Sequence, residues 1–284
     1  MREQLIRRAK ELNISDIGFV SAEVTYDLCL SLRGAEEKNV FSFLPETKTV
    51  IVCFVSYYTD VPGSRISRYA RGKDYHIVVK ERMEQLSELL RKNGFLTKVF
   101  CDAWGLNERY LAQLAGLGFI GKNRMLIHPK FGSYGFLGCI LTDCRMEPSE
   151  PLAQKSCMEC GACLRACPGR ALSEGGFCPE RCASYLTQER RELTGAEQEI
   201  VFASGMLWGC DRCQEVCPHN QSLPETEIPE FRERLISEPE LLDSDRMFRK
   251  KYAEYAFSWR GKKPLERNQK LLDSEKNPTK NNIM

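Results

Sequence analysis

Apolar residues in the first half of the chain follow two alternating periods, one typical of helices and one typical of strands. Residues 2–12 and 78–90 place apolar side chains three and four positions apart, and a third helical stretch covers 106–117. Short runs rich in β-branched and aromatic residues favour strands at 16–20, 49–58, 95–102 and 134–142. The pattern predicts one mixed domain of about 145 residues, a usual size, with Gly118 as the C-cap of the third helix.

The character of the chain changes after residue 147. A polar stretch bounded by Pro148 and Pro151 is typical of a linker, a cysteine-rich segment follows, and the chain becomes strongly polar and charged beyond residue 220. These changes predict three parts, which are residues 1–147, 148–225 and 226–284. We expect the last part to be partly helical and then disordered over 273–284, where there are too few apolar residues to pack.

The cysteine-rich segment reads C-M-E-C-G-A-C-L-R-A-C-P over residues 157–168. Bacterial ferredoxins use this C-x2-C-x2-C-x3-C-P spacing to hold a [4Fe-4S] cluster. In two-cluster ferredoxins the cysteine before proline ligates the other cluster, so Cys167 predicts a second site. The run C-D-R-C-Q-E-V-C-P over 210–218 supplies it. The sequence therefore indicates electron transfer through two [4Fe-4S] clusters.

The downstream run lacks the first cysteine of a full motif, because Leu207 occupies that position. Cys182 is the natural replacement, and Cys178 is the less favoured alternative. The ligand hypothesis has two sets: Cys157, Cys160, Cys163 and Cys217 for one cluster, and Cys167, Cys182, Cys210 and Cys213 for the other.

Structural zinc and disulfides are the alternative uses of so many cysteines. Zinc sites usually pair two C-x2-C knuckles, whereas three evenly spaced cysteines followed by C-P suit a cubane better. Disulfides require an oxidising compartment, while the charged N-terminal segment has no signal-peptide apolar core and indicates a cytoplasmic protein. Five cysteines stand singly, mostly in apolar surroundings, and most are expected to be buried thiols: Cys29, Cys53, Cys101, Cys139 and Cys144.

Composition narrows the choice of partners. A chain of 284 residues with 42% hydrophobic content can bury a sizeable core. Its formal net charge of +2 gives no general signal for nucleic acid, and the local cluster of Arg65, Arg68, Arg71 and Lys73 is more often a solvated face than a phosphate site. No apolar stretch approaches the roughly 20 residues that span a bilayer.

Several segments carry a resemblance to a known family. They read S-R-Y-A-R-G-K-D-Y-H over 67–76, A-G-L-G-F-I-G-K over 115–122 and G-S-Y-G-F-L-G over 132–138, with Asp102 and the pair Glu108-Arg109 between the first two. The cysteine region agrees, through R-C-A-S-Y-L-T over 181–187 and G-C-D-R-C-Q-E-V-C-P over 209–218. From the N-terminus to about residue 220 the chain resembles the epoxyqueuosine reductases, cobalamin-dependent iron-sulfur enzymes that finish queuosine in tRNA.

This resemblance implies an α+β chain in which a nitroreductase-like, cobalamin-binding domain precedes a two-cluster ferredoxin-like domain. It implies that the clusters reduce cobalt, that low-valent cobalt attacks the epoxide-bearing ring, that an acid protonates the oxygen and that water leaves to give the alkene. It further implies a tRNA substrate and an electron donor such as ferredoxin or flavodoxin, with no membrane involved.

Asp102 matches the family's proposed proton donor. That role requires a carboxyl that stays protonated near neutral pH, which burial beside an apolar corrin face would supply. The alternative is that Asp102 caps the helix beginning near Leu106. With the family match we favour the acid.

The resemblance also suggests which residues contact cobalamin: Tyr69, Tyr75, His76, Gly118, Lys122, Gly132 and Ser133. A single histidine near a helix start is more often structural than a cobalt ligand. Gly116, Gly118 and Gly121 permit close backbone approach by the corrin or its phosphate tail. Their G-x-G-x-x-G spacing follows a helix rather than a strand, so we reject a dinucleotide site.

Two features depart from the family. Trp104 stands near the position where a small residue and a proline are typical, and it is expected to reshape the pocket. Longer members carry a C-terminal helical-repeat domain that helps to hold tRNA, and here only residues 258–268 resemble its beginning, as in a short form without the repeats. A cobalamin-dependent reductase of another substrate and a non-catalytic two-cluster electron carrier are the alternatives; a carrier leaves the segments between Arg68 and Lys122 unexplained.

Overall fold

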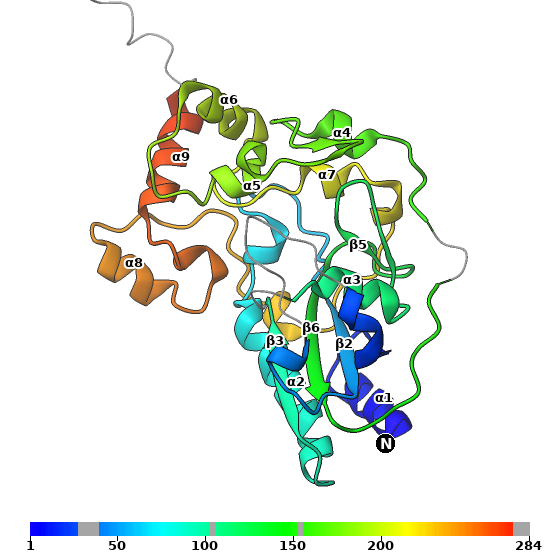
Figure 1. The fold of residues 1–284 in the computed structure, drawn as a ribbon. Coiled ribbons are helices and arrows are strands. Elements are labelled where there is room, and N and C mark those ends of the chain that lie inside the picture. The colour runs from blue at the N-terminus through cyan, green and yellow to red at the C-terminus, as the bar shows by residue number, and fades with distance from the viewer. Residues whose placement is uncertain (28–39, 103–105, 153–155, 275–284) are drawn as a thin grey trace, which may run out of the picture. The chain divides into compact units, whose positions relative to one another are not determined.

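The computed structural model describes residues 1–27, 40–102, 106–152 and 156–274 (Figure 1). The chain forms two compact units, and each draws on three segments of the sequence. The first contains Met1–Tyr58, Tyr75–Met158 and His219–Pro229. The second contains Thr59–Asp74, Glu159–Pro218 and the described residues from Glu230 onward. Among the described residues, no helix has both the length and the apolar character needed to cross a membrane.

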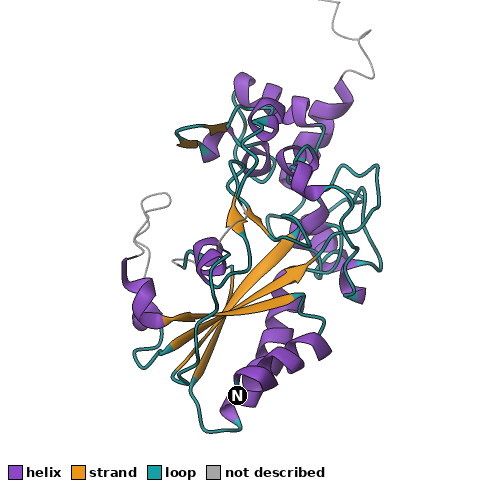
Figure 2. Cartoon of the chain, turned by 90° about the vertical axis from the view of Figure 1, so that its right-hand side faces the viewer, coloured by secondary structure: helices purple, strands orange, loops and turns teal. Residues whose placement is uncertain are grey.

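The first unit is built on an antiparallel sheet (Figure 2). Its four strands lie in the order β1-β2-β6-β3. In its register, Val52 lies opposite Cys139. Every residue of β2 is buried, because both faces of the sheet are covered, and the strand is therefore continuously apolar rather than alternating. The strands are β1 (Asp16–Ser21), β2 (Thr49–Ser56), β3 (Thr97–Cys101) and β6 (Gly135–Thr142).

Helices cover the two faces of this sheet. Leu111 of α3 (Glu108–Leu114) packs in one core cluster with Val52 and Cys139. Met83 of α2 (Tyr75–Arg91) lies instead over Gly138, the neighbour of Cys139 in β6, and α1 (Arg2–Glu11) packs beside α2. Since successive strand residues point to opposite faces, α2 and α3 lie on opposite sides of the sheet. The helices and strands predicted for this half are confirmed, with shifts of a few residues at their ends.

The third helix uses neither of the expected caps. It begins at Glu108, where the side chain of Asn107 accepts a hydrogen bond from the backbone N–H of Tyr110 at 3.2 Å, so Asp102 does not cap it. Beyond its C-terminus, Gly116 rather than Gly118 takes the left-handed conformation, with φ of +73°. A short hairpin that the sequence did not reveal follows, made of β4 (Phe119–Ile120) and β5 (Leu126–Ile127).

The second unit consists mainly of short helices joined by loops. Leu186, Leu193 and Val201 form a small core cluster, against which Leu271 packs. The helix pairs α4/α7, α5/α6 and α6/α9 are in contact. The elements are α4 (Ala162–Ala166), β7 (Leu172–Ser173), β8 (Gly176–Phe177), α5 (Ala183–Leu186), α6 (Gly195–Ser204), α7 (Arg212–Glu215), α8 (Asp245–Lys251) and α9 (Lys263–Asp273).

The units differ from the continuous parts predicted at 1–147 and 148–225. Residues 59–74 leave the first unit after β2 and join the second, where Ile66 forms a parallel bridge with Trp208. Conversely, Thr226 belongs to the first unit, where its Oγ1 donates to the carbonyl oxygen of Ser56 at 2.6 Å. Such pairing between distant segments leaves no trace in local composition, so the local pattern does not reveal these units.

The region predicted as a polar extension at 226–284 is packed rather than peripheral over its described length. Phe248, Phe257 and Leu265 are fully buried. Asn268 of α9 is fully buried as well, and its Nδ2 donates to the carbonyl oxygens of Thr187 and Leu207, both at 2.8 Å. Residues 275–284, most of the stretch expected to be disordered, lie outside the described residues.

Replacing Asn268 with alanine should destabilise the second unit. The change leaves two buried carbonyl oxygens without these donors, which we expect to lower the free energy of unfolding by about 2–4 kcal/mol. Lys270→Ala, an exposed change on the same helix, is the matched control. Urea unfolding of both variants provides the comparison, and equal midpoints would show that α9 is only loosely attached.

Candidate functional site

Four of the predicted cluster cysteines lie near one another in the second unit. Each lies in or beside a short helix: Cys167 follows α4, Cys182 precedes α5, Cys210 precedes α7 and Cys213 is within it. The pKa of the Cys210 thiol is raised to about 12, first by burial and further by Asp211, Cys182 and Cys167, whereas the backbone N–H of Arg212 acts to lower it. The structure thus brings together the four residues proposed for the second cluster.

The pKa of Cys213 is raised by burial in the same way, with further contributions from Cys210, Cys182 and Cys167. Because these thiols hold their protons tightly, loading iron must displace the protons. Two backbone amides donate hydrogen bonds to sulfur in this group of thiols. The N–H of Ala171 donates to Cys167 Sγ at 3.2 Å, and the N–H of Arg212 donates to Cys210. Hydrogen bonds to sulfur are one of the means by which proteins tune iron-sulfur clusters.

The four thiols do not converge on a single point. Within the part of the chain that the structure describes, no three Cys, His, Asp or Glu side chains are placed to hold one metal ion. A cubane presents a separate iron to each thiolate, so its ligands need to surround a volume rather than share one centre.

The cysteines proposed for the first cluster come from both units. Cys157 belongs to the first unit, whereas Cys160, Cys163 and Cys217 belong to the second. Cys163 is buried on α4, and Cys217 follows α7, the helix that contacts α4.

The two candidates for the eighth cluster ligand, Cys182 and Cys178, have different surroundings in the structure. The Cys182 thiol contributes to the raised pKa values of Cys210 and Cys213, so it lies near these two thiols. Cys178 is exposed, and its Sγ faces Glu180 Oε2 at 3.4 Å. These placements favour Cys182.

Three of the singly placed cysteines are buried, as predicted. Cys53, Cys139 and Cys144 are at most 5% exposed. Burial raises the pKa of Cys53 to about 12 and also raises the pKa values of Cys139 and Cys144, so these thiols are poor nucleophiles at neutral pH. Cys101 is half-buried, and Cys29 lies outside the described residues.

A second group of polar residues surrounds Asp102 in the first unit. Asp102 directly follows β3 and has a left-handed backbone, with φ of +53°. Tyr75 Oη donates to Asp102 Oδ2 at 2.8 Å, and His76 Nε2 lies 3.4 Å from the same oxygen. The start of α2 thus supplies two polar partners for one carboxylate.

These partners shift the pKa of the Asp102 carboxyl in the direction opposite to the one expected from the sequence. The hydrogen bond with His76 lowers the pKa of the carboxyl most, and Tyr75 and the charge of Arg109 lower it further, while partial burial acts to raise it. The side chain is 65% exposed. Expected to be a protonated acid in an apolar site, Asp102 is instead held toward its ionised form, because its polar partners outweigh desolvation.

Aromatic rings stack beside this carboxylate. The Tyr75 ring lies parallel to Phe136, with centroids 4.3 Å apart and 6° between planes, and His76 stacks on Tyr75 at 4.0 Å. Tyr57 packs on Phe136 at 4.3 Å. Tyr75, His76, Phe136 and Tyr57 therefore form an aromatic stack that extends from α2 to the ends of β2 and β6.

Other predicted cofactor contacts are occupied by the protein itself. The N–H of Ser133 donates to Asn220 Oδ1 at 2.8 Å, and Asn220 Nδ2 donates to Ser133 Oγ at 2.8 Å. A Cβ added at Gly132 would also collide with the Asn220 side chain. Sequence reasoning missed this buried asparagine, for which its place just after the C-P-H run was the available signal.

The glycines expected to admit a corrin are required by internal packing. A Cβ at Gly116 would collide with the carbonyl oxygen of Glu150, and one at Gly118 would lie 2.5 Å from the carbonyl oxygen of Ile127. At Gly121 it would lie 2.7 Å from Ile127 Cδ1. Their small size accommodates neighbouring segments of the first unit, so it gives no evidence of a ligand.

Four further residues were predicted to belong to the site or lie near it in the sequence. Lys122 is half-buried in the β4–β5 hairpin. Tyr69 belongs to the second unit, where its hydroxyl accepts a hydrogen bond from the indole N–H of Trp208 at 2.8 Å. Asn123 is only 6% exposed, and among the residues that the structure describes its Nδ2 has no hydrogen-bond acceptor, so it is a buried donor that sequence reasoning missed. Trp104 lies outside the described residues.

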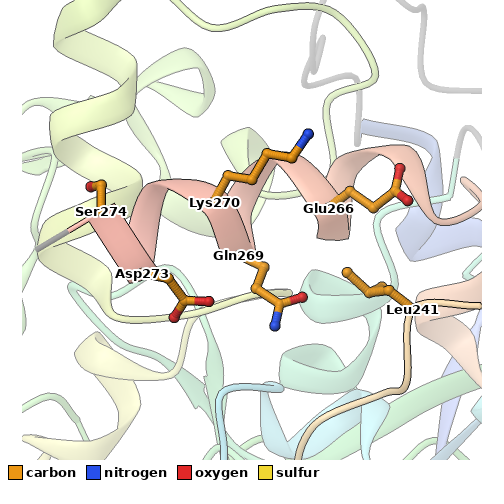
Figure 3. Close-up of a pocket in the computed structure, with 6 residues that line it drawn as sticks. All are labelled: Leu241, Glu266, Gln269, Lys270, Asp273 and Ser274. Carbon is orange, nitrogen blue, oxygen red and sulfur yellow. The ribbon is translucent and has the colours of Figure 1, made fainter. Parts of the chain in front are cut away.

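A shallow depression in the second unit is separate from these groups (Figure 3). Side chains of α9 form most of it, and none is a cysteine or a predicted cofactor contact. Its lining residues are Leu241, Glu266, Gln269, Lys270, Asp273 and Ser274.

Comparison with known proteins places these features in a family. Residues 38–103 match the family described as "Epoxyqueuosine reductase QueG, DUF1730", and residues 156–220 match the "4Fe-4S double cluster binding domain". With the α+β fold and the grouped thiols, these matches define the class: an oxidoreductase that carries two [4Fe-4S] clusters.

Individual relatives agree over almost the whole chain. The epoxyqueuosine reductase of Bacillus subtilis strain 168 is 34% identical over 94% of this chain and 77% of its own length. An epoxyqueuosine reductase solved with an epoxyqueuosine-modified tRNA-Tyr stem loop superposes with a TM-score of 0.85 at 32% identity, covering 96% of this chain and 80% of that one. A second solved structure is an epoxyqueuosine reductase from Bacillus subtilis in which the loop of the catalytic aspartate is swung out of the active site. It superposes with a TM-score of 0.81 at 31% identity and covers 96% of this chain and 81% of that one. The chain belongs to the epoxyqueuosine reductase family.

Cys182→Ala should lose one cluster, whereas Cys178→Ala should keep both. The first change removes a thiol from the grouped set and the second removes an exposed one, so we expect about four irons per chain against about eight. Iron and sulfide assays after anaerobic reconstitution provide the test. Two full clusters in Cys182→Ala would contradict the assignment.

Removing the partners of Asp102 should raise the pKa of its carboxyl toward the ordinary value of about 3.9. We expect a larger rise in His76→Ala than in Tyr75→Phe, since His76 has the greater effect. Because the folded-state pKa is depressed, the interaction stabilises the fold above about pH 4 and is lost as pH falls through the folded-state value. Carbon-13 NMR titration of labelled aspartate measures both variants, and the reverse order would contradict the geometry.

Proposed function

We propose that this protein reduces epoxyqueuosine to queuosine in tRNA. The reaction breaks both C–O bonds of the epoxide and forms an alkene, consuming two electrons and two protons and releasing the oxygen as water. The membership of the family supports this substrate, and the observation that carries the proposal is the joint presence of a grouped cluster thiol set and an acidic group held at the end of a strand. An electron carrier would have no use for the second feature.

Electrons enter through the two clusters, for which the proposed ligands are the two sets named above. A cluster exchanges one electron at a time, so two clusters match the two electrons that each substrate consumes. The electron donor that we propose is a small carrier of low potential, such as ferredoxin or flavodoxin.

We also propose that the first unit binds cobalamin. The aromatic stack of Tyr75, His76, Phe136 and Tyr57 offers flat apolar surface beside a carboxylate, and Asn123 offers a buried donor without an acceptor. These features fit a large planar macrocycle with amide and phosphate acceptors, and Tyr75, His76 and Asn123 are the contacts that we propose. When bound, cobalamin would supply a strongly reducing cobalt nucleophile.

Asp102 is the proposed point of proton delivery to the departing oxygen. Tyr75 and His76 are placed to pass a proton to this carboxylate, since both contact the same Oδ2 atom. Imidazole is well suited to this task because it gains and loses protons between about pH 5 and 8. We propose that the three residues carry the proton together. Asp102 itself can therefore be ionised before the proton is delivered, which agrees with its lowered pKa.

Single-turnover conversion of epoxyqueuosine in a tRNA anticodon stem-loop tests the proposal. We expect product from the reconstituted, cobalamin-loaded protein with a strong reductant, and a loss of about 10²-fold or more in rate for Asp102→Asn, the scale of general acid catalysis. Glu88→Gln, an exposed change on α2, should retain the full rate and serves as control. Absence of product despite bound, reducible cobalamin would contradict the proposed substrate.

A further inference from the structure

Asp211 lies between two proposed ligands of the second cluster and is almost completely buried. It directly follows Cys210, precedes Cys213 by two positions and is 2% exposed. It occupies the N-cap position of α7, where an aspartate ordinarily accepts hydrogen bonds from its own helix, yet its side chain makes no cap hydrogen bond. The carboxylate is used elsewhere.

The partners of this carboxylate are more than 140 residues away in sequence. Ser67 Oγ donates to Asp211 Oδ1 at 2.5 Å, and the backbone N–H of Arg68 donates to Oδ2 at 2.8 Å. Each carboxylate oxygen therefore holds a donor from the same short segment. Ser67 is itself only 1% exposed, so this contact is protected from water.

The surrounding chain reinforces the contact. The N–H of Leu207 donates to the carbonyl oxygen of Arg65 at 2.7 Å, and the N–H of Ser67 donates to the carbonyl oxygen of Trp208 at 2.8 Å. A Cβ at Gly209 would collide with Ser67 and lie 2.9 Å from the Tyr69 ring. Residues 65–69 and 207–211 are thus held together by backbone hydrogen bonds and side-chain contacts. Asp211 is the last residue of the second segment, and it lies between the proposed ligands Cys210 and Cys213.

A buried arginine also lies close to the carboxylate. Arg71 is 4% exposed, and its guanidinium donates to the carbonyl oxygens of Ile66 at 2.8 Å and of Val61 at 2.6 Å. These contacts fix the arginine within the same segment, close enough for its positive charge to interact with Asp211. The segment thus offers Asp211 two hydrogen-bond donors and a nearby positive charge.

We propose that Asp211 is a positioning residue for the second cluster: it anchors the loop carrying Cys210 and Cys213 to Ser67 and Arg68. This inference rests on the proposed ligand set. Cys167 and Cys182 come from separate loops, so the cluster corners match only if each loop is held in place. Ser67 and Arg68 belong to the segment Thr59–Asp74 of the second unit. The next two residues in the chain are Tyr75 and His76, the partners of Asp102.

Comparing Asp211→Ala with Asp211→Asn tests whether the hydrogen bonds of Asp211 hold the ligands of the second cluster in place. The alanine removes both contacts, whereas an asparagine can accept from Arg68 N–H through Oδ1 and donate to Ser67 Oγ through Nδ2. We expect the full chain, reconstituted anaerobically, to hold about four irons with alanine and about eight with asparagine. Glu215→Ala, which removes an exposed carboxylate from α7, is the matched control and should hold about eight.

A kinetic measurement keeps the proposal testable if Asp211→Ala does not fold. Ser67→Ala removes only one donor, and we expect iron of the second cluster to be lost to a chelator about 10-fold faster than in the unchanged protein. The electron paramagnetic resonance signal missing from Cys213→Ala identifies that cluster.

Two results would overturn the inference. One is unchanged iron retention in both Asp211→Ala and Ser67→Ala, and the other is equal loss in Asp211→Asn and Asp211→Ala. Retention of both clusters by Cys213→Ala would instead contradict the underlying ligand set, so the two failures are distinguishable.

Discussion

The requirement of a cubane for four thiolates around one volume is the constraint on which the second unit depends. The proposed ligands Cys167, Cys182, Cys210 and Cys213 come from three separate segments, each of which contains a helix of only four or five residues. Helices this short are not stable alone, and the core cluster of Leu186, Leu193 and Val201 is small. Hydrogen bonds from residues 65–69 and from Asn268 therefore have an unusually large part in holding the loops, and cluster binding would add to the folding free energy.

The first unit has a different arrangement, in which a polar group is held at the edge of an apolar sheet. Strands β2 and β6 are buried on both faces and form a rigid base, and α2 begins directly beside their ends. Tyr75 and His76 can therefore reach Asp102 while Tyr75 stacks on Phe136 and His76 stacks on Tyr75. The left-handed backbone of Asp102 is a strained conformation for a non-glycine residue, and strain of this kind concentrates at functional sites.

Local sequence signals predicted the parts of this molecule that depend on local chemistry. The β-branched run of β2 and the cysteine spacing from 157 to 168 needed no knowledge of distant residues. The rest depended on contacts between remote segments. Ser67 and Asp211 are 144 positions apart, and the donors of Asn268 serve carbonyls more than 60 positions away. The direction of the Asp102 pKa also lay beyond sequence reasoning, because it is the balance of His76, Tyr75 and partial burial. At Gly116 and Gly118 the sequence suggested space for a ligand. The structure shows instead that a larger residue there would collide with the backbone of Glu150 or Ile127.

If the clusters supply the electrons that open the epoxide, electron counting in a single turnover will show it. Protein loaded with both clusters and cobalamin would be reduced, freed of excess reductant and mixed with an epoxyqueuosine-containing stem-loop, with cluster absorbance and queuosine followed together. The account predicts that two electrons leave the protein for each queuosine formed, at one common rate. Queuosine formation without reoxidation of the protein, or reoxidation without queuosine, would contradict it.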